Sequence, residues 1–201
     1  MLKKLLLISI FLICSSFLYS QTVKTTLEAV SEAYSNDINS SFMYAKFSMV
    51  SKDKSLSNLF LVISDSKSCH ANILYDVSIQ EKITDTILKA QVIDPKVGTD
   101  IENLKAAISM TSYEYTKMYP DLLKIVNKDN KKEMSNEINR MIKVEKLNND
   151  LFTKAINDLE NNKAITDKYY LCENCGYVET NSAPDKCPIC ERARNTFKEY
   201  K

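Results

Sequence analysis

The sequence predicts a mainly α-helical protein, in which a four-helix bundle is followed by a small C-terminal domain built around a metal ion. Apolar residues recur at steps of three and four along four long segments, and four cysteines lie in two C-x-x-C pairs near the C-terminus. The 201 residues, 44% apolar and 26% charged, suit one folded domain with a small appendage. We expect a signal peptide at residues 1–20, the bundle at 21–165 and the small domain at 166–201.

Charge and the rarest residue types exclude several classes of protein. The 27 basic and 26 acidic residues leave a net charge of +1, so the overall charge does not favour binding to nucleic acid. The only glycines are Gly98 and Gly176, which excludes the glycine-rich loops that cradle phosphate groups. Because His70 is the one histidine, a two-histidine metal site within one chain is also excluded.

The first twenty residues have the layout of a secretory signal peptide. Lys3 and Lys4 precede an apolar run at residues 5–19, which is shorter than the ~20 residues of a membrane span. Cleavage after Ser20 would leave an exported chain, in the periplasm or another extracytoplasmic compartment. Two alternatives stay open: a lipoprotein anchored through Cys14, and an uncleaved anchor. Apart from these, we expect no contact with a membrane.

The helical segments pair into two hairpins. Ser55 is the expected N-cap of the second helix, and short links around Asp53 and Asp129 make the helices that they join antiparallel neighbours. A longer stretch at residues 83–98 joins the two hairpins, which is the connection of a ferritin-like bundle. The four apolar stripes begin near residues 23, 56, 101 and 134.

Each apolar stripe also carries polar residues near its middle. Buried charges are costly unless they are paired or bound to metal, so polar side chains at one level of four helices indicate a site in the bundle core, or its remnant. The alternative is that the helical phase is off by one position and some of these side chains face solvent. The residues are Asp37, Lys67, His70, Thr111, Glu114, Glu145 and Asn148.

The C-terminal cysteines have the spacing of a tetrahedral metal site. Cys172 and Cys175 form one pair, Cys187 and Cys190 the other, and eleven residues separate the pairs. Four thiolates in two facing turns suit zinc or a single iron, and two disulfides are the alternative. Cys69 is expected to be a small core residue. We expect the aromatic residues near the cysteines to form the core of the small domain, namely Tyr169, Tyr170, Tyr177 and Phe197.

Several motifs resemble one known family. The tail reads Tyr-Leu-Cys-Glu-Asn-Cys-Gly-Tyr-Val at residues 170–178 and Ala-Pro-Asp-Lys-Cys-Pro-Ile-Cys at 183–190. Together with residues 101–107, 113–120 and 144–146, it resembles the rubrerythrin family over most of the chain. The resemblance implies a ferritin-like bundle with two irons and a rubredoxin-like domain whose single iron supplies electrons. It also implies reduction of hydrogen peroxide to water.

Carried over position by position, the resemblance implies an incomplete di-iron site. Four positions keep a metal-binding group: Asp37, His70, Glu114 and Glu145. Three positions are altered: Lys67 and Thr111 stand where the family has glutamate, and Asn148 where it has histidine. We therefore expect no normal di-iron centre.

Two hypotheses describe what replaces that centre. The Lys67 ammonium could supply the positive charge that the metals otherwise give, because a buried carboxylate cluster without a cation would be unstable. Alternatively, the four retained groups could hold a single metal ion.

Three functions follow, and the sequence assigns no catalytic residue. The first is an exported electron-transfer protein with one iron in the cysteine site. The second is a peroxide reductase with an atypical bundle metal, in which Tyr44 and Tyr113 are candidate hydrogen-bond partners. The third is a structural or interaction protein with zinc among the cysteines. In the family, the iron of one subunit serves the bundle of its partner, so we expect a homodimer if electron transfer persists, with a redox partner that the sequence does not identify.

Overall fold

The structure is a computed structural model that describes residues 24–84 and 86–201. The predicted signal peptide, including the alternative lipid anchor at Cys14, lies outside the described residues. None of the helices in the described part of the chain combines the length and the apolarity needed to cross a membrane.

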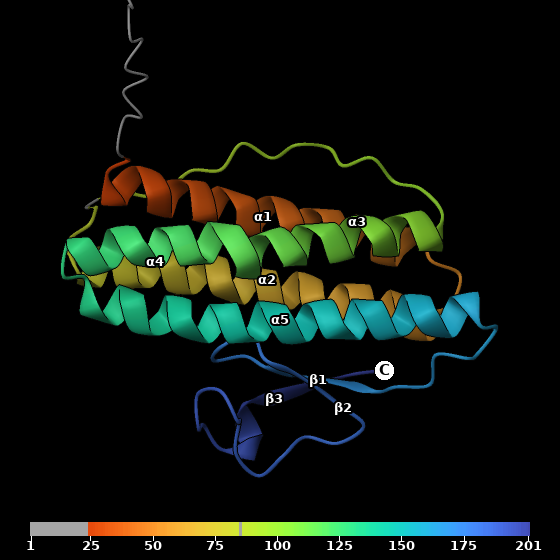
Figure 1. The fold of residues 1–201 in the computed structure, drawn as a ribbon. Helices are drawn as coiled ribbons and strands as arrows, with labels where there is room; N and C mark the ends of the chain where they lie inside the picture. The colour runs from red at the N-terminus through yellow and green to blue at the C-terminus, as the bar shows by residue number, and fades with distance from the viewer. Residues whose placement is uncertain (1–23, 85) are drawn as a thin grey trace, which may run out of the picture.

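The predicted four-helix bundle is confirmed (Figure 1). Its first hairpin consists of α1 (Thr26–Val50) and α2 (Lys54–Gln80). The third rod is made of α3 (Asp100–Tyr113), the π-helical turn η1 (Glu114–Met118) and α4 (Tyr119–Lys128), and the fourth is α5 (Lys132–Glu160).

The long crossover between the hairpins runs alongside α1 (Figure 1). The Asn39 side chain holds it there, because its Nδ2 donates to the Gln91 carbonyl at 3.1 Å and its Oδ1 accepts from the Ile93 amide at 2.8 Å.

Side-chain caps determine where the helices begin. Thr25 and Thr99 each form a capping box with the glutamate three residues later, at the starts of α1 and α3. At α2 the cap is Asp53, whose carboxylate accepts a hydrogen bond from the Leu56 amide at 2.8 Å. The prediction of Ser55 as this cap is wrong, because the helix begins at Lys54 and Ser55 lies in its first turn.

The third rod contains a π-helical turn that the periodicity did not predict. The amide of Tyr119 bonds to the carbonyl of Glu114, five residues earlier. The extra residue shifts the helical phase, so that both Met118 and Tyr119 face the core. Glu114, the first residue of this turn, is fully buried.

A three-stranded antiparallel sheet forms the small domain, with β1 (Tyr169–Cys172) between β2 (Val178–Thr180) and β3 (Phe197–Tyr200). A short 3-10 turn, η2 (Arg194–Thr196), leads into β3. The sheet lies under the bundle, on the side of α2 and α5 (Figure 1).

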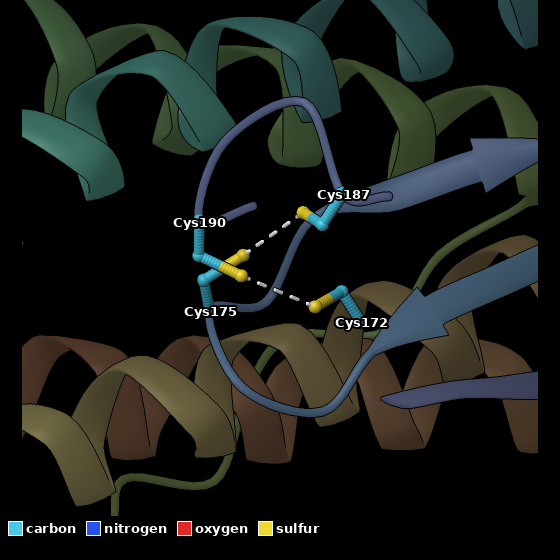
Figure 2. A group of neighbouring side chains, drawn as sticks. All are labelled: Cys172, Cys175, Cys187 and Cys190. Atoms are coloured by element: carbon cyan, nitrogen blue, oxygen red, sulfur yellow. Dashed lines mark hydrogen bonds between the residues drawn. The ribbon is translucent and has the colours of Figure 1, made fainter. Parts of the chain in front are cut away.

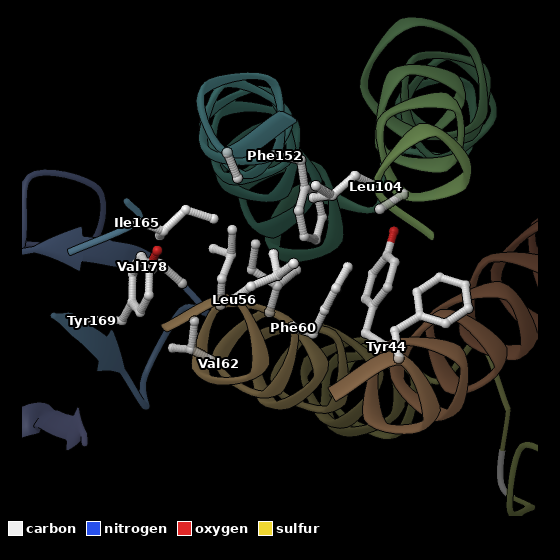
Figure 3. Packing of buried hydrophobic residues seen from close by; sticks show 14 of the residues in the cluster. Tyr44, Leu56, Phe60, Val62, Leu104, Phe152, Ile165, Tyr169 and Val178 are labelled. Atoms are coloured by element: carbon white, nitrogen blue, oxygen red, sulfur yellow. The ribbon is translucent and has the colours of Figure 1, made fainter. Parts of the chain in front are cut away.

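Two apolar clusters fill the bundle, one toward each end. The first joins the aromatic residues Tyr44, Phe60 and Phe152 (Figure 3), and the second surrounds Val30 and Met134. The polar residues of the stripes belong to neither cluster. They form a layer in the middle of the bundle.

The prediction that the aromatic residues near the cysteines form the core of the small domain is wrong for part of the set. Tyr169 is 1% exposed and packs with the bundle cluster, as does Tyr200 of the neighbouring strand. Tyr177 and Phe197 do pack around the cysteines, with their rings 6.3 Å apart. Tyr170 is half-buried, and its hydroxyl donates to Glu199 at 3.3 Å. The sheet therefore packs against the bundle through one face.

Candidate metal centre and buried ion cluster

The four C-terminal cysteines converge on one point (Figure 2). Their Sγ atoms all lie within 4.8 Å of one another. The distance is 3.6 Å both from Cys172 to Cys190 and from Cys175 to Cys187. A disulfide bond is about 2.0 Å long, so these sulfurs are not bonded to each other, and the four thiols are free.

The spacing of the sulfurs fits a tetrahedral ion. With metal–sulfur bonds of ~2.3 Å, the edges of such a tetrahedron are about 3.8 Å long. Cys172, Cys175 and Cys187 are almost completely buried, and backbone amides of Asn174 and Tyr177 form hydrogen bonds to the thiols of the first pair. Thiolates held in this way suit zinc or a single iron. The predicted ligand set is thus brought together.

Two side chains of α2 fix the first cysteine turn onto the bundle of the same chain. The Ser66 hydroxyl donates to the Gly176 carbonyl at 2.6 Å, and His70 Nε2 lies 3.3 Å from the Cys175 carbonyl oxygen. Gly176 has a φ of 79°, and a Cβ atom at this position would lie 2.7 Å from His70 Nε2. Both the conformation and the close approach therefore require glycine.

Cys69 lies at this contact, so its prediction as a core residue is wrong. The residue is half-buried, and its thiol donates to the Glu173 carbonyl at 3.3 Å. Burial raises the pKa of the Cys69 thiol to about 12, with smaller contributions from Cys172 and Cys190. Cys69 is therefore a neutral thiol beside the cysteine site.

Five ionisable side chains from the four rods meet in the middle of the bundle, and none is exposed to solvent. The Lys67 ammonium lies among three carboxylates. It forms a short hydrogen bond to Glu114, and it lies 2.7 Å from Glu145 Oε1 and 3.6 Å from Asp37 Oδ1. His70 Nδ1 lies 2.9 Å from Glu145 Oε1. The prediction that these side chains face inward at one level is confirmed.

Glu145 and His70 link this ion cluster to the cysteine site. Glu145 Oε1 is within ion-pair distance of both Lys67 and His70, although neither contact has the alignment of a hydrogen bond. The other nitrogen of the His70 ring faces the Cys175 carbonyl. One imidazole ring thus spans the gap between the two sites.

The carboxyl groups of the cluster differ in their readiness to ionise. Burial raises the pKa of Glu114 to about 8, despite the attraction of Lys67. Burial acts on Glu145 in the same direction, but Lys67 and His70 hold the pKa of this carboxyl down at about 2. Burial also raises the pKa of Asp37. For Lys67, burial disfavours the charged ammonium, but the three neighbouring carboxylates outweigh this effect and raise the pKa of Lys67. At neutral pH, Lys67 and Glu145 form the ionised pair.

Sequence reasoning missed Tyr119. Its hydroxyl is 2.8 and 2.7 Å from the two carboxylate oxygens of Asp37, to which it donates. A regular helix would point this side chain away from Glu114, and only the π-helical turn brings it inward. Tyr44, a candidate hydrogen-bond partner of a bundle metal site, is buried, but its hydroxyl has no hydrogen-bond partner among the described residues. The prediction of Tyr113 near the site is wrong, because this side chain is 44% exposed.

Two altered positions are also buried, but they contribute little to the cluster. The Thr111 hydroxyl donates back to the Ala107 carbonyl at 2.9 Å, within its own helix. Asn148 Nδ2 lies 3.5 Å from Glu145 Oε2, and its Oδ1 has no hydrogen-bond partner among the residues that the structure describes. Glu114 is held from α1 instead, by Asn36 Nδ2 at 2.7 Å.

Comparison with known proteins agrees with this architecture. The family model described as "Rubrerythrin" matches residues 28–156, and the one described as "Rubrerythrin, rubredoxin-like domain" matches residues 170–198. A putative rubrerythrin from Methanocaldococcus jannaschii is 27% identical over 188 residues, which cover 87% of this chain and 92% of that protein. Nigerythrin from Nitratidesulfovibrio vulgaris is 23% identical over 181 residues, 89% of this chain and 88% of its own.

A solved structure shows the same fold. Fully reduced, all-ferrous nigerythrin matches with a TM-score of 0.80 at 22% identity, over 90% of this chain and 89% of the nigerythrin chain. The sequence match to the rubrerythrin model spans well over half of the chain, and the four cysteines lie within the rubredoxin-like match. The chain therefore belongs to the rubrerythrin family of iron-binding proteins.

Proposed function

We propose that this protein transfers single electrons through one iron held by its four C-terminal cysteines. The observation that carries the proposal is the convergence of four free thiols within 4.8 Å in a chain of this family. Iron bound by four thiolates supplies a one-electron ferric–ferrous couple.

The chain's own residues prepare this site for electron transfer. Burial of Cys172, Cys175 and Cys187 keeps water from the sulfurs, and amide hydrogen bonds to sulfur favour the more negative, reduced state. Ser66 and His70 hold the peptide that carries Cys175 in place. A site held rigidly in this way needs little reorganisation when its charge changes.

The test is the identity of the metal. Elemental analysis of protein purified from its native compartment should find one iron per chain, and the oxidised protein should show visible charge-transfer bands that a reductant removes. A Cys187→Ser variant should lose both the bands and the metal. Colourless protein with one zinc per chain would contradict electron transfer and support the structural role instead.

We further propose that the bundle does not hold a pair of irons. The groups present do not fit one, because an ammonium lies among the carboxylates and Thr111 turns away from them. Within residues 24–84 and 86–201, the four cysteines are the one group of three or more potential metal-binding side chains whose ligand atoms converge.

Peroxide reduction at an atypical bundle metal is the second candidate, because Asp37, Glu114 and Glu145 still surround Lys67, and His70 still contacts Glu145. Steady-state reduction of hydrogen peroxide distinguishes the two functions. We expect no turnover beyond that of a Glu145→Gln variant with an intact cysteine site. Turnover by the parent that this variant loses would establish the enzyme.

Export is the final part of the proposal, and the pattern at residues 1–20 supports it. The intact mass of the protein from its native cells should correspond to a chain that starts near Gln21. A diacylglyceryl mass on Cys14 would identify a lipoprotein, and a full-length cytoplasmic chain would contradict export.

A further inference from the structure

The ion cluster of the bundle contains its own cation. We propose that the Lys67 ammonium keeps a divalent metal ion out of a latent site formed by Asp37, His70, Glu114 and Glu145. This inference rests on the proposed loss of the iron pair and names the group that takes its place. Replacing Lys67 should therefore create metal binding in the bundle.

The ammonium and a metal ion could not share these carboxylates. Lys67 Nζ lies 2.7 Å from Glu145 Oε1 and forms a short hydrogen bond to Glu114. A metal ion ~2.1 Å from the same oxygens would be in van der Waals contact with Nζ, with like charges and no intervening water. Because all of these side chains are fully buried, Lys67 has no solvent-filled space to move into.

The charge balance of the cluster also depends on Lys67. Three carboxyl groups, one from each of α1, η1 and α5, face Lys67 and His70 of α2, and no other charged side chain contacts them within the described residues. A buried carboxylate that loses its partner costs several kcal/mol. Without the ammonium, the cluster would need bound protons or an external cation.

Two neutral, buried side chains beside the cluster carry oxygen atoms that form no hydrogen bond among the described residues. Asn148 Oδ1 and the Tyr44 hydroxyl are buried without a hydrogen-bond partner among the residues described. The Asn148 side chain contacts Glu145. Among the carboxylates, Glu114 contributes most to the raised pKa of the Tyr44 phenol. Asn148 Oδ1 is an amide oxygen, one of the neutral groups that complete the coordination of a hard divalent cation.

Manganese is the appropriate probe, because it prefers oxygen and imidazole and competes poorly for thiolates. Full-length protein with its cysteine site loaded is incubated with excess Mn²⁺, desalted, and analysed by elemental analysis and electron paramagnetic resonance. The parent should retain no Mn²⁺. The Lys67→Glu variant should retain one Mn²⁺ per chain, and a further Glu145→Gln substitution should abolish this binding.

Lys117→Glu is the matched control, because it makes the same charge change at an exposed lysine whose one ion pair among the described residues is with Asp121. It should bind no Mn²⁺. Lys67→Met removes the charge without adding a ligand, and Mn²⁺ should raise its melting temperature. If either Lys67 variant folds only partly, refolding in Mn²⁺ should recover it.

Three results would overturn the inference: Mn²⁺ bound in the bundle of the parent, a folded Lys67→Glu variant that binds none, or an unfolded one that Mn²⁺ does not rescue. The metal and colour of the cysteine site are measured in the same samples. A parent without iron would contradict the proposed function, but the Mn²⁺ binding of the Lys67 variants would still test the inference about Lys67.

Discussion

The three carboxyl groups around Lys67 are chemically alike, but they do not share one protonation state. The pKa of Glu145 is held at about 2 by Lys67 and His70 against the effect of burial, so this group is ionised at neutral pH. Burial raises the pKa of Glu114 to about 8, so this group largely keeps its proton. The negative charge of the core is thus reduced by one ammonium and by the proton on Glu114.

The state of Glu114 predicts how stability depends on pH. In the unfolded chain this carboxyl has a pKa of 4.5, and folding raises it to about 8. The folded protein therefore holds a proton that the unfolded chain releases, and stability falls as pH rises from about 5 to about 8, by at most ~1.4 kcal/mol per pH unit. A Glu114→Gln variant cannot ionise and should lack this decline.

Urea unfolding of the metal-loaded parent and of the Glu114→Gln variant at pH 5, 6.5 and 8 measures the difference between their free energies of unfolding. Ionisable groups outside the cluster affect parent and variant alike, so the test is how the difference between the two free energies of unfolding changes with pH. A constant difference across this range would show that Glu114 is already ionised in the folded protein.

Gly176 is the residue on which the contact between the cysteine turn and the bundle depends most. Alanine would be strained at a φ of 79°, and its Cβ would press on His70 Nε2. Gly176→Ala should lower the free energy of unfolding by ~1–3 kcal/mol. Adding His70→Ala should recover part of this loss, because it removes the clash but not the strain. Strictly additive losses would contradict the close approach.

At the scale of elements, the start of α2 provides a direct comparison between two candidate caps. Asp53 accepts the Leu56 amide hydrogen bond, whereas Ser55 lies within the helix. Asp53→Ala should therefore destabilise the protein by about 1 kcal/mol, and Ser55→Ala by much less. Thermal or chemical unfolding of the two variants measures this, and the reverse order would mean that α2 begins later.

The sequence was sufficient to predict the elements whose signals are local. The apolar periodicity located the four rods, and the same period placed Asp37, Lys67 and Glu145 on their inner faces. The C-x-x-C spacing located the four metal ligands, because both turns and their thiols lie within short segments.

The features that were missed depend on departures from local regularity or on distant contacts. Tyr119 reaches Asp37 only because a π-helical turn inserts one residue into the third rod. The position of Cys69 beside Glu173 results from docking of two segments 104 residues apart. Neither follows from helical periodicity, which treats each helix as regular and alone.

At the scale of the whole molecule, the small domain depends on both its metal and the bundle. A domain of this size is too small to fold without a bound metal. Its sheet also packs against the bundle through Leu171 and Tyr200. Within this single chain, His70 already lies between Glu145 and the Cys175 carbonyl. The contact between the two sites is thus formed within one chain.

Removal of the metal should therefore unfold one part of the molecule and leave the other. A strong chelator should remove the hydrogen-exchange protection of amides in residues 169–200 while the helical circular dichroism signal stays nearly constant. The bundle keeps a second apolar cluster that the small domain does not touch, so its helices should persist. A sheet that survives complete loss of metal would contradict this dependence.

The location of metal in the molecule tests the central claim most directly. Anomalous difference maps at the iron and zinc edges, from crystals of protein purified from its native compartment, locate every such ion. The structure predicts a single iron peak among Cys172, Cys175, Cys187 and Cys190, and none between Glu114 and Glu145. A pair of peaks within the bundle would contradict the account.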